Sequence, residues 1–220
     1  ENETQTAATI RQRSLAVNGR DKFDALTRIL ESETTDGVLV FVRTKNATGE
    51  VAERLTDRGY LASPLNGDIP QSLRERTIDQ LKANKIDIVV ATDVAARGLD
   101  VSRISHVVNY DMPHDVEGYI HRIGRTGRAG RDGEAILLIT PKETHLLRQI
   151  QHQTRQTIER MELPLIDVIN ERRIERFKKR ITAAMEASDL QFFQQLVETY
   201  QKDTEVDLAT IAAALAKMAQ

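Results

Sequence analysis

The clearest chemical pattern in the sequence is a stretch of ten residues, 121–130, that reads His-Arg-Ile-Gly-Arg-Thr-Gly-Arg-Ala-Gly. Arg125 and Arg128 lie three residues apart in it, and a guanidinium group is a planar, permanently charged fork that fits phosphate oxygens. The glycines allow close backbone approach and positive φ angles. For a single basic residue, a surface turn with a solvated charge would be the better interpretation. For the whole stretch, the pattern favours binding of a polyphosphate.

A second pattern, residues 91–100, reads Ala-Thr-Asp-Val-Ala-Ala-Arg-Gly-Leu-Asp and directly follows an apolar run. Ligands of open α/β sheets gather at the carboxyl ends of strands, where the Thr92 hydroxyl and helix N-terminal amides can hold a phosphate. Asp100, two residues after Gly98, can accept a hydrogen bond from a ribose hydroxyl. Ordinary helix capping by Thr92 or Asp93 is the alternative interpretation, and both can hold at once.

The segments that must position these residues alternate between strand-like and helix-like patterns. Apolar runs rich in β-branched residues are typical of strands buried on both faces of a parallel sheet. Such runs occupy residues 38–42, 86–91, 106–110 and 135–139. Helical patterns lie at residues 23–30, 51–55, 73–81 and 142–156. The alternation predicts an α/β fold, with a parallel sheet flanked by helices and right-handed crossovers.

The composition changes after about residue 160. Residues 161–220 contain no glycine and no strand-like run, although glycine is frequent before them. Apolar residues at helical spacing predict a helix over 167–185, and further apolar stripes predict two more helices after it. We therefore expect a first domain over residues 1–160 and a small all-α segment over 161–220.

The starts of the last two helices are predicted from capping residues. Ser188 with Gln191 three residues later forms a capping-box pattern for a helix over 189–201. Thr204 with Asp207 is a weaker pattern of the same kind for the third helix. The second of these helices carries aromatic and aliphatic residues around more than one face, which points to a partner surface. They are Phe192, Phe193, Leu196, Val197 and Tyr200.

Composition excludes several classes of protein. The 220 residues include no cysteine, so a disulfide framework, a thiolate metal site and a thiol nucleophile are excluded. No apolar run reaches about 18 residues, and the first nine residues are acidic and polar, so we expect no membrane span, no signal peptide and a cytoplasmic location. His145 and His152 share a predicted helix, but two histidines are too few for a metal site, and we expect none.

The charge of the chain is near zero on average, with 31 basic and 33 acidic side chains. This average argues against a protein that holds nucleic acid by bulk charge alone. Residues 161–220 hold 8 basic and 10 acidic side chains, which leaves 23 of each for residues 1–160. Within the tail, residues 171–180 hold six basic and two acidic side chains. A solvated helix face is the first interpretation of this segment, and a strip that contacts RNA is the second.

Taken together, these patterns resemble the C-terminal RecA-like lobe of superfamily 2 helicases, specifically the DEAD-box RNA helicases. Residues 38–45 are similar to motif IV of that family, residues 91–100 to motif V and residues 121–128 to motif VI. Residues 66–68, Asn-Gly-Asp, with Gln71 and Arg74, resemble motif IVa. The tail from residue 163 onward resembles the helical dimerisation segment of the bacterial cold-shock DEAD-box proteins, the DeaD group.

The resemblance implies a role for each matching residue at an ATP site. Arg125 and Arg128 would reach the γ-phosphate of ATP, with Arg128 as the arginine finger. Asp100 would contact the ribose, next to Gly98 of the same motif. His121 would couple this lobe to the N-terminal RecA-like lobe of the same protein.

The resemblance also implies binding to RNA through its sugar-phosphate backbone, without sequence specificity. The residues implied are Arg43, Gly67, Asp68, Arg74 and Thr92. Arg97 would bridge motifs, in contact with either nucleotide or protein. A homodimer through residues 161–220 and a role in ribosome assembly or mRNA turnover in the cold follow from the same resemblance.

The sequence also lacks parts that the resemblance requires. It contains no Gly-Lys pair, so it has no P-loop, and no Asp-Glu-Ala-Asp to hold Mg²⁺. In the family these sit on the N-terminal lobe. We therefore expect half of an ATP-hydrolysing site, inactive alone. The alternatives are a non-catalytic dimerisation or RNA-binding module and a lobe of another superfamily 2 helicase.

Overall fold

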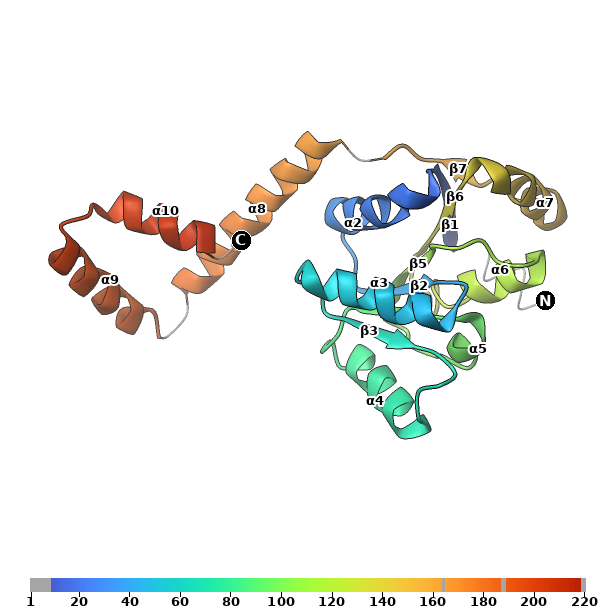
Figure 1. Cartoon of the computed structure of the whole chain (residues 1–220), viewed down its shortest axis with the longest axis horizontal. Coiled ribbons are helices and arrows are strands. Elements are labelled where there is room, and N and C mark those ends of the chain that lie inside the picture. The colour runs from blue at the N-terminus through green and yellow to red at the C-terminus, as the bar shows by residue number, and fades with distance from the viewer. Residues whose placement is uncertain (1–8, 164, 187–188, 219–220) are drawn as a thin grey trace. The chain divides into compact units, whose positions relative to one another are not determined.

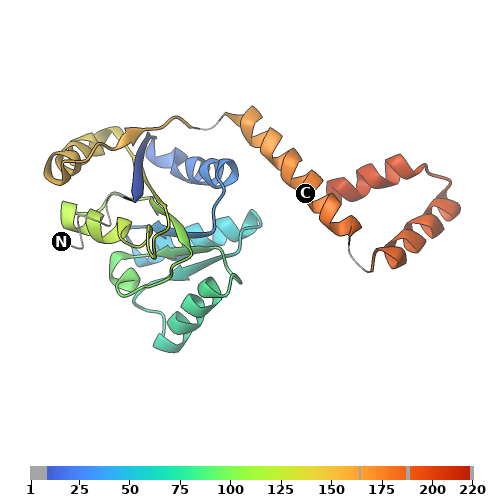
Figure 2. The same ribbon diagram turned by 180° about the vertical axis from the view of Figure 1, so that it is seen from behind.

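The computed structural model describes residues 9–163, 165–186 and 189–218 of the chain, which forms two compact units (Figure 1). The first unit ends at Ile169 and the second begins at Asn170. The first is an α/β unit built on a single sheet, and the second consists of helices (Figure 2).

The sheet of the first unit has seven strands in the order β3-β4-β2-β5-β6-β1-β7, and every neighbouring pair is parallel. The strands are β1 (Ile10–Ala16), β2 (Gly37–Phe41), β3 (Ala62–Leu65), β4 (Ile88–Ala91), β5 (Ile104–Asn109), β6 (Gly133–Ile139) and β7 (Glu159–Arg160). The predicted parallel sheet is therefore confirmed. The four predicted strands are β2, β4, β5 and β6, which occupy adjacent positions in the middle of the sheet.

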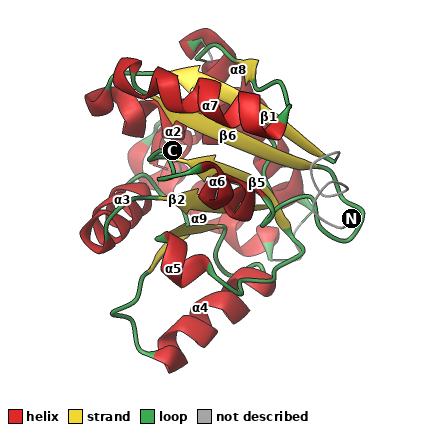
Figure 3. Ribbon diagram, turned by 90° about the vertical axis from the view of Figure 1, so that its right-hand side faces the viewer, coloured by secondary structure: helices red, strands yellow, loops and turns green. Residues whose placement is uncertain are grey.

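Helices cover both faces of this sheet (Figure 3). They are α2 (Lys22–Ser32), α3 (Lys45–Asp57), α4 (Gln71–Lys82), α5 (Asp93–Ala96), α6 (Val116–Ile123) and α7 (Thr144–Thr154), with 3₁₀ turns η1 (Gly19–Asp21) and η2 (Pro141–Glu143). Alternate residues of β2 show the division. Val38 and Val40 pack with α2 and α3, whereas Leu39 and Phe41 pack with α4 and α5. Both faces are apolar because both are covered, which explains the continuous apolar runs.

Strand β1 was not predicted, because its sequence alternates polar and charged residues. Arg13 on this strand is 9% exposed, and ion pairs compensate for its burial. Its guanidinium donates to both oxygens of Glu33, at 2.7 and 2.6 Å, and its Nε donates to Glu134 at 2.9 Å. His106 of β5 also lies 3.0 Å from Glu33. This network connects β1, β5, β6 and the end of α2.

Glu33 is the shared acceptor of this network, and its titration gives a test. Burial alone would raise the pKa of Glu33, but hydrogen bonds from His106 and Arg13, with their charges, outweigh burial and lower it to about 2. Since the folded-state pKa lies below the ordinary value of 4.5, the charged form stabilises the fold above pH 4.5. That contribution is lost as the pH falls from 4.5 towards 2.

We predict that Glu33→Gln lowers the free energy of unfolding by about 2 kcal/mol at neutral pH. The difference from the unmodified chain should shrink as the pH falls below 4.5, because protonation then removes the same charge from the unmodified protein. Urea unfolding followed by circular dichroism measures both quantities. Glu53→Gln on the exposed side of α3 is the control. A pH-independent difference would show that the charge of Glu33 is not what stabilises the network.

The second unit contains most of α8 (Ile166–Met185) together with α9 (Leu190–Thr204) and α10 (Leu208–Met218). The three predicted helices are present, but one predicted start is wrong. Thr204 ends α9, where its hydroxyl donates to the Tyr200 carbonyl, and Asp207 alone caps α10 by accepting from the Thr210 amide at 3.0 Å. Ser188 lies outside the described residues, and Asp189, at the start of α9, makes no side-chain capping bond.

The second unit has almost no buried core. From Asn170 onward, Ile211 is the one buried residue among those that the structure describes. Most of the predicted partner surface is exposed: Phe192 is 66% exposed, Leu196 58% and Tyr200 55%, whereas Val197 is half-buried. In the described part of the chain, no helix combines the length and apolarity needed to cross a bilayer.

Candidate functional site

Four neighbouring strands of the sheet end at the same level. In the register of β3, β4, β2 and β5, Ala91 is the partner of both Leu65 and Phe41, and Phe41 is also the partner of Asn109. Each of these is the last residue of its strand. The loops that follow therefore begin side by side along one carboxyl edge of the sheet.

Four of the five predicted RNA-contacting residues lie on these loops. Gly67 and Asp68 follow β3, Thr92 follows β4 and Arg43 follows β2. The Thr92 hydroxyl makes no capping bond to α5, so the capping interpretation of Thr92 is wrong. Asp68 forms an ion pair with Lys45, which the sequence did not single out.

Arg43 is held at its backbone rather than at its side chain. Its amide donates to the Asp111 carboxylate at 2.9 Å, while its guanidinium is half exposed and lies 3.8 Å from Glu143. The other oxygen of Asp111 lies 3.3 Å from Nζ of the buried Lys22. The loop after β2 is thus fixed to β5 and α2, and the Arg43 side chain extends from a rigid support.

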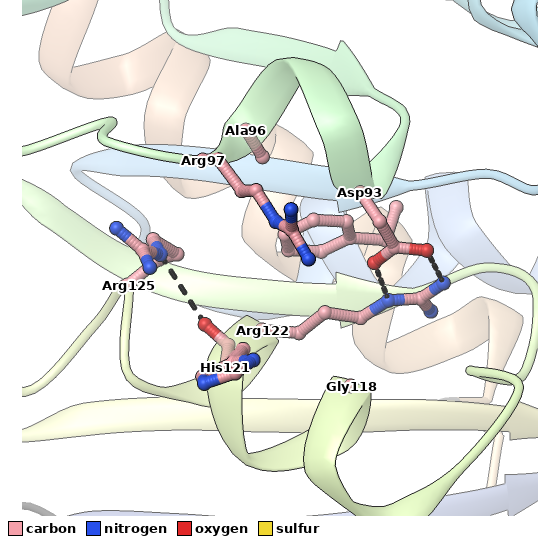
Figure 4. Close-up of a pocket in the computed structure, with 8 residues that line it drawn as sticks. Asp93, Ala96, Arg97, Gly118, His121, Arg122 and Arg125 are labelled. Carbon is pink, nitrogen blue, oxygen red and sulfur yellow. Dashed lines mark hydrogen bonds and ion pairs between the residues drawn. The ribbon is translucent and has the colours of Figure 1, made fainter.

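Arg74, the fifth residue, has a different environment. Its guanidinium donates to the carbonyls of Ala95 at 2.8 Å and Arg97 at 2.9 Å, at the end of α5. It therefore fixes the backbone between Thr92 and Gly98. The Arg97 side chain is exposed and lines a small pocket with His121 and Arg125 (Figure 4).

Arg122 occupies the centre of this region and is 2% exposed. Its Nε and Nη2 donate to the two carboxylate oxygens of Asp93, at 2.5 and 2.8 Å (Figure 4). Its Nη1 donates to the Asn109 side chain at 3.0 Å and to the Asp111 carbonyl at 2.6 Å. The guanidinium carbon lies 4.9 Å from the Phe41 ring centroid, within cation–π range. One side chain thus connects α5, β5, β2 and α6.

Neither the central role of Arg122 nor its pairing with Asp93 was predicted from the sequence. The signal available in the sequence was an arginine on an otherwise apolar helix face, between Tyr119 and Ile123, both of which are buried. A charge on that face requires a partner, but spacing alone does not say which of the neighbouring acids supplies it.

Arg125 and Arg128 lie in the loop after α6, near the opposite, amino ends of β5 and β6. The adjacent Thr126 hydroxyl donates to the carbonyl of Ile104, the first residue of β5, at 2.7 Å. These arginines therefore lie at the opposite end of the strands from the residues predicted to contact RNA. Helices α5 and α6 run between the two groups, so each group lies at one end of this helical layer.

The two arginines have the same local geometry. Nε of Arg125 donates to the carbonyl of His121 at 3.2 Å, and Nε of Arg128 donates to the carbonyl of Gly124 at 2.8 Å. Each arginine thus bonds to the residue four positions before it. Nη1 of Arg125 also donates to the Leu99 carbonyl at 3.1 Å. Burial, with the nearby charge of Arg128, lowers the pKa of Arg125, and Asp100 partly offsets this.

Asp100 and Arg128, both predicted to contact nucleotide, form an ion pair with each other. The Asp100 side chain is 81% exposed, so this pair is weak and can exchange for a ligand. Gly98 has a φ of 73°, which few residues other than glycine adopt. Gly127 has a φ of 67°, and a Cβ there would lie 2.8 Å from Cγ1 of Ile10. These glycines set the shape of both loops.

The described residues do not fit a Mg²⁺ site. They contain no group of three or more His, Cys, Asp or Glu side chains placed to hold a metal. The two acids nearest the arginines, Asp93 and Asp100, are paired with Arg122 and Arg128. Nδ1 of His145 lies 2.9 Å from the Lys142 carbonyl. No step is therefore assigned to a metal held by this lobe.

Comparison with known protein families shows which family the chain belongs to. The model of the helicase conserved C-terminal domain matches residues 21–130, and the model of the RNA helicase DeaD dimerization domain matches residues 164–220. The chain belongs to the helicase C-terminal domain family. Its two matches are those of the C-terminal part of a DeaD-type DEAD-box RNA helicase, as the motifs predict.

Curated relatives are similar in sequence to this helicase lobe and its helical tail. The chain is 52% identical over 195 residues to the ATP-dependent RNA helicase DeaD of Mycobacterium tuberculosis, covering 89% of this chain and 35% of the relative. It is 49% identical over 218 residues to the ATP-dependent RNA helicase DeaD of Escherichia coli, covering 98% of this chain and 35% of the relative. The chain thus spans about a third of the length of these relatives.

Solved structures show the same fold. A DEAD box protein from the hyperthermophile Methanococcus jannaschii has a TM-score of 0.65 and 43% identity, covering 70% of this chain and 42% of that one. Dbp5 of S. cerevisiae, bound to RNA and ADP BeF3, has a TM-score of 0.66 and 35% identity, covering 76% of this chain and 44% of that one. The RecA-like architecture predicted for the helicase lobe is confirmed.

The pairing of Arg122 with Asp93 can be tested by removing the carboxylate charge. Asp93→Asn keeps the shape of the side chain but leaves the buried Arg122 charge without its carboxylate. We expect the free energy of unfolding to fall by about 2 kcal/mol, since Arg122 is buried and loses its carboxylate, while the Asp93 side chain is 42% exposed and the pair is partly screened by water. Urea unfolding measures this free energy, and Asp132→Asn, at an exposed position just before β6, is the control. Equal stability of the two variants would contradict the assignment.

Proposed function

We propose that this lobe supplies the arginines of an ATP-hydrolysing site in a longer RNA helicase. The observation that carries the proposal is the repeated anchoring of Arg125 and Arg128, whose Nε atoms are both bonded to carbonyls of the α6 end. Anchoring at Nε fixes the plane of each guanidinium before a ligand arrives. Pre-organised donors are the kind of group that stabilises charge developing in a transition state.

In this proposal Arg125 and Arg128 face the γ-phosphate of ATP bound to an N-terminal lobe. Charge spreads over the phosphoryl oxygens during transfer, and an arginine finger is worth about 10³–10⁵ in rate. Arg128 must first leave Asp100, which frees that carboxylate to accept from the ribose hydroxyl. The P-loop and the residues that hold Mg²⁺ belong to the N-terminal lobe. His121, exposed at the end of α6, would face that lobe.

RNA would lie along the carboxyl edge, at the loops that follow β3, β4 and β2. Thr92 and Gly67 can contribute a hydroxyl and a backbone amide, and the Arg43 guanidinium can pair with a phosphate. Such contacts hold the backbone and do not read bases, so the preference for RNA would come from 2′-hydroxyl groups and strand shape. Arg74 supports this edge indirectly, through the backbone of α5.

The second unit would join two copies of the helicase. Support comes from the exposed apolar residues of α9 and from the match of residues 164–220 to a DeaD dimerization domain. We also propose a cytoplasmic role in ribosome assembly or mRNA turnover in the cold, which the motif resemblance to the DeaD group implies. A non-catalytic RNA-binding or dimerisation module is the second candidate, and the first test below separates it.

For the arginine finger, we predict that Arg128→Lys lowers RNA-stimulated ATP hydrolysis by about 10³-fold or more, because lysine cannot reproduce the planar fork. Hydrolysis is measured with the chain joined to the N-terminal lobe of a DeaD relative. Arg131→Lys, three residues further along the same loop, is the matched control and should leave the rate unchanged. The chain alone should not hydrolyse ATP. Unchanged turnover in Arg128→Lys would favour the non-catalytic module.

For the dimer, we predict that the unmodified chain sediments at twice its monomer mass of 24.8 kDa. Phe192→Glu combined with Leu196→Glu places two charges on the exposed apolar face of α9 and should give a monomer. Gln194→Glu, an exposed polar position of the same helix, adds a charge elsewhere and should leave the dimer intact. A monomeric unmodified chain would reject the proposed dimer.

A further inference from the structure

Helix α8 has two faces of different chemistry within the second unit. Its apolar residues recur at intervals of three and four: Ile174, Phe177, Ile181 and Met185. A second set, Arg172, Arg173, Lys179 and Arg180, follows the spacing i, i+1, i+7, i+8, which also keeps residues on one side of a helix. Position 176 completes this spacing at i+4 and is also an arginine. We call this second set the basic stripe.

The side chains of the basic stripe lie in solvent. Arg172, Arg173, Lys179 and Arg180 are all exposed. Lys179 forms an ion pair with Glu175 at 3.1 Å, and both side chains are more than half exposed. Exposed pairs of this kind contribute little and exchange readily. The stripe is therefore accessible to a polyanion.

Charge is strongly segregated along the tail. Residues 171–180 carry a net charge of +4, from six basic and two acidic side chains. Residues 181–220 carry a net charge of −4, from two basic and six acidic side chains. The near-neutral average of the chain hides this separation. A helix face that is merely solvated can mix basic and acidic residues freely. A surface that binds a polyanion needs several positive charges close together, with few acidic residues among them.

We propose that the basic stripe of α8 binds the sugar-phosphate backbone of RNA, as a surface separate from the carboxyl edge of the lobe. The inference rests on the proposed function, which makes RNA the polyanion that the protein meets. The apolar residues of α8 lie on a different side of the helix, so a contact between two copies through them leaves the stripe in solvent. The spaced guanidinium and ammonium groups then contact phosphates without reading bases.

An anionic membrane would also attract a basic helix, but the composition of α8 favours RNA. Helices that lie in a membrane surface insert a broad apolar face with large aromatic residues. The apolar side of α8 belongs instead to the segment that matches a dimerization domain. Its one aromatic residue, Phe177, is half-buried.

The test compares two variants of the full chain that each lose two positive charges. Arg172→Gln with Arg180→Gln removes charge from the stripe. Lys178→Gln with Lys202→Gln removes the same charge from another side of α8 and from α9. Binding of a fluorescein-labelled single-stranded RNA without ATP is measured by anisotropy between low and physiological salt. Circular dichroism and sedimentation confirm that both variants keep their helices and assembly.

The stripe variant should lose roughly tenfold in affinity, and its plot of log K against log salt should flatten by about 1.4, for two lost phosphate contacts. The matched variant should retain both values. Equal losses in the two variants would overturn the inference, since only overall charge would then matter. A stripe variant that binds RNA normally but fails to self-associate, or fails only to bind phosphatidylserine vesicles, would overturn it too.

A third variant separates this inference from the proposed function. Arg43→Gln lies on the carboxyl edge of the lobe and removes one predicted phosphate contact there. If Arg43→Gln weakens RNA binding and the stripe variant does not, the lobe proposal stands and the stripe inference fails. If only the stripe variant weakens binding, the stripe inference stands and the RNA contact assigned to the lobe edge fails.

Discussion

The candidate site depends on one buried guanidinium. Arg122, which is 2% exposed, is the side chain through which α5, α6 and the ends of β2 and β5 are held together. Because its charge is compensated by Asp93, the start of α5 cannot move without breaking a bidentate pair. The end of α6, which is followed by the loop that carries Arg125, is fixed by the same side chain. The two ends of the helical layer are thereby coupled through a single residue.

The fold could be predicted where burial alone decides the structure. Strands β2, β4, β5 and β6 are apolar on both faces, so their sequences show what covers them. Strand β1 could not be predicted, because Arg13 is buried by partners that lie on distant parts of the chain. Strand β7 has only two residues, too few for any period to appear. The pattern of apolar residues along a segment predicts whether that segment is buried. It does not predict which charged side chains pair across distant strands of the sheet.

The same limit applies to the site. Glycine-rich, arginine-rich spacing predicted functional loops at these positions, and the structure shows a positive φ at Gly98 and close packing at Gly127, which leave few other residue types possible there. Which side chains meet was not predictable. Asp100 pairs with Arg128, and Arg74 bonds to the backbone of α5, although each was expected to contact a ligand directly. Contacts between groups about 20 or more residues apart depend on topology, which spacing does not contain.

Because four neighbouring strands end at the same level, the sheet also limits where residues can be inserted into or deleted from this lobe. A residue inserted into a parallel strand would advance the following loop by about 3.3 Å relative to its neighbours. Arg43, Thr92 and Gly67 follow three adjacent strands whose last residues are partners in the register. An insertion or deletion within β2, β3 or β4 would therefore break their alignment and reverse the facing of every later side chain in that strand. Loops at the amino ends of the same strands do not carry these three residues, so a change of length there would leave this alignment intact.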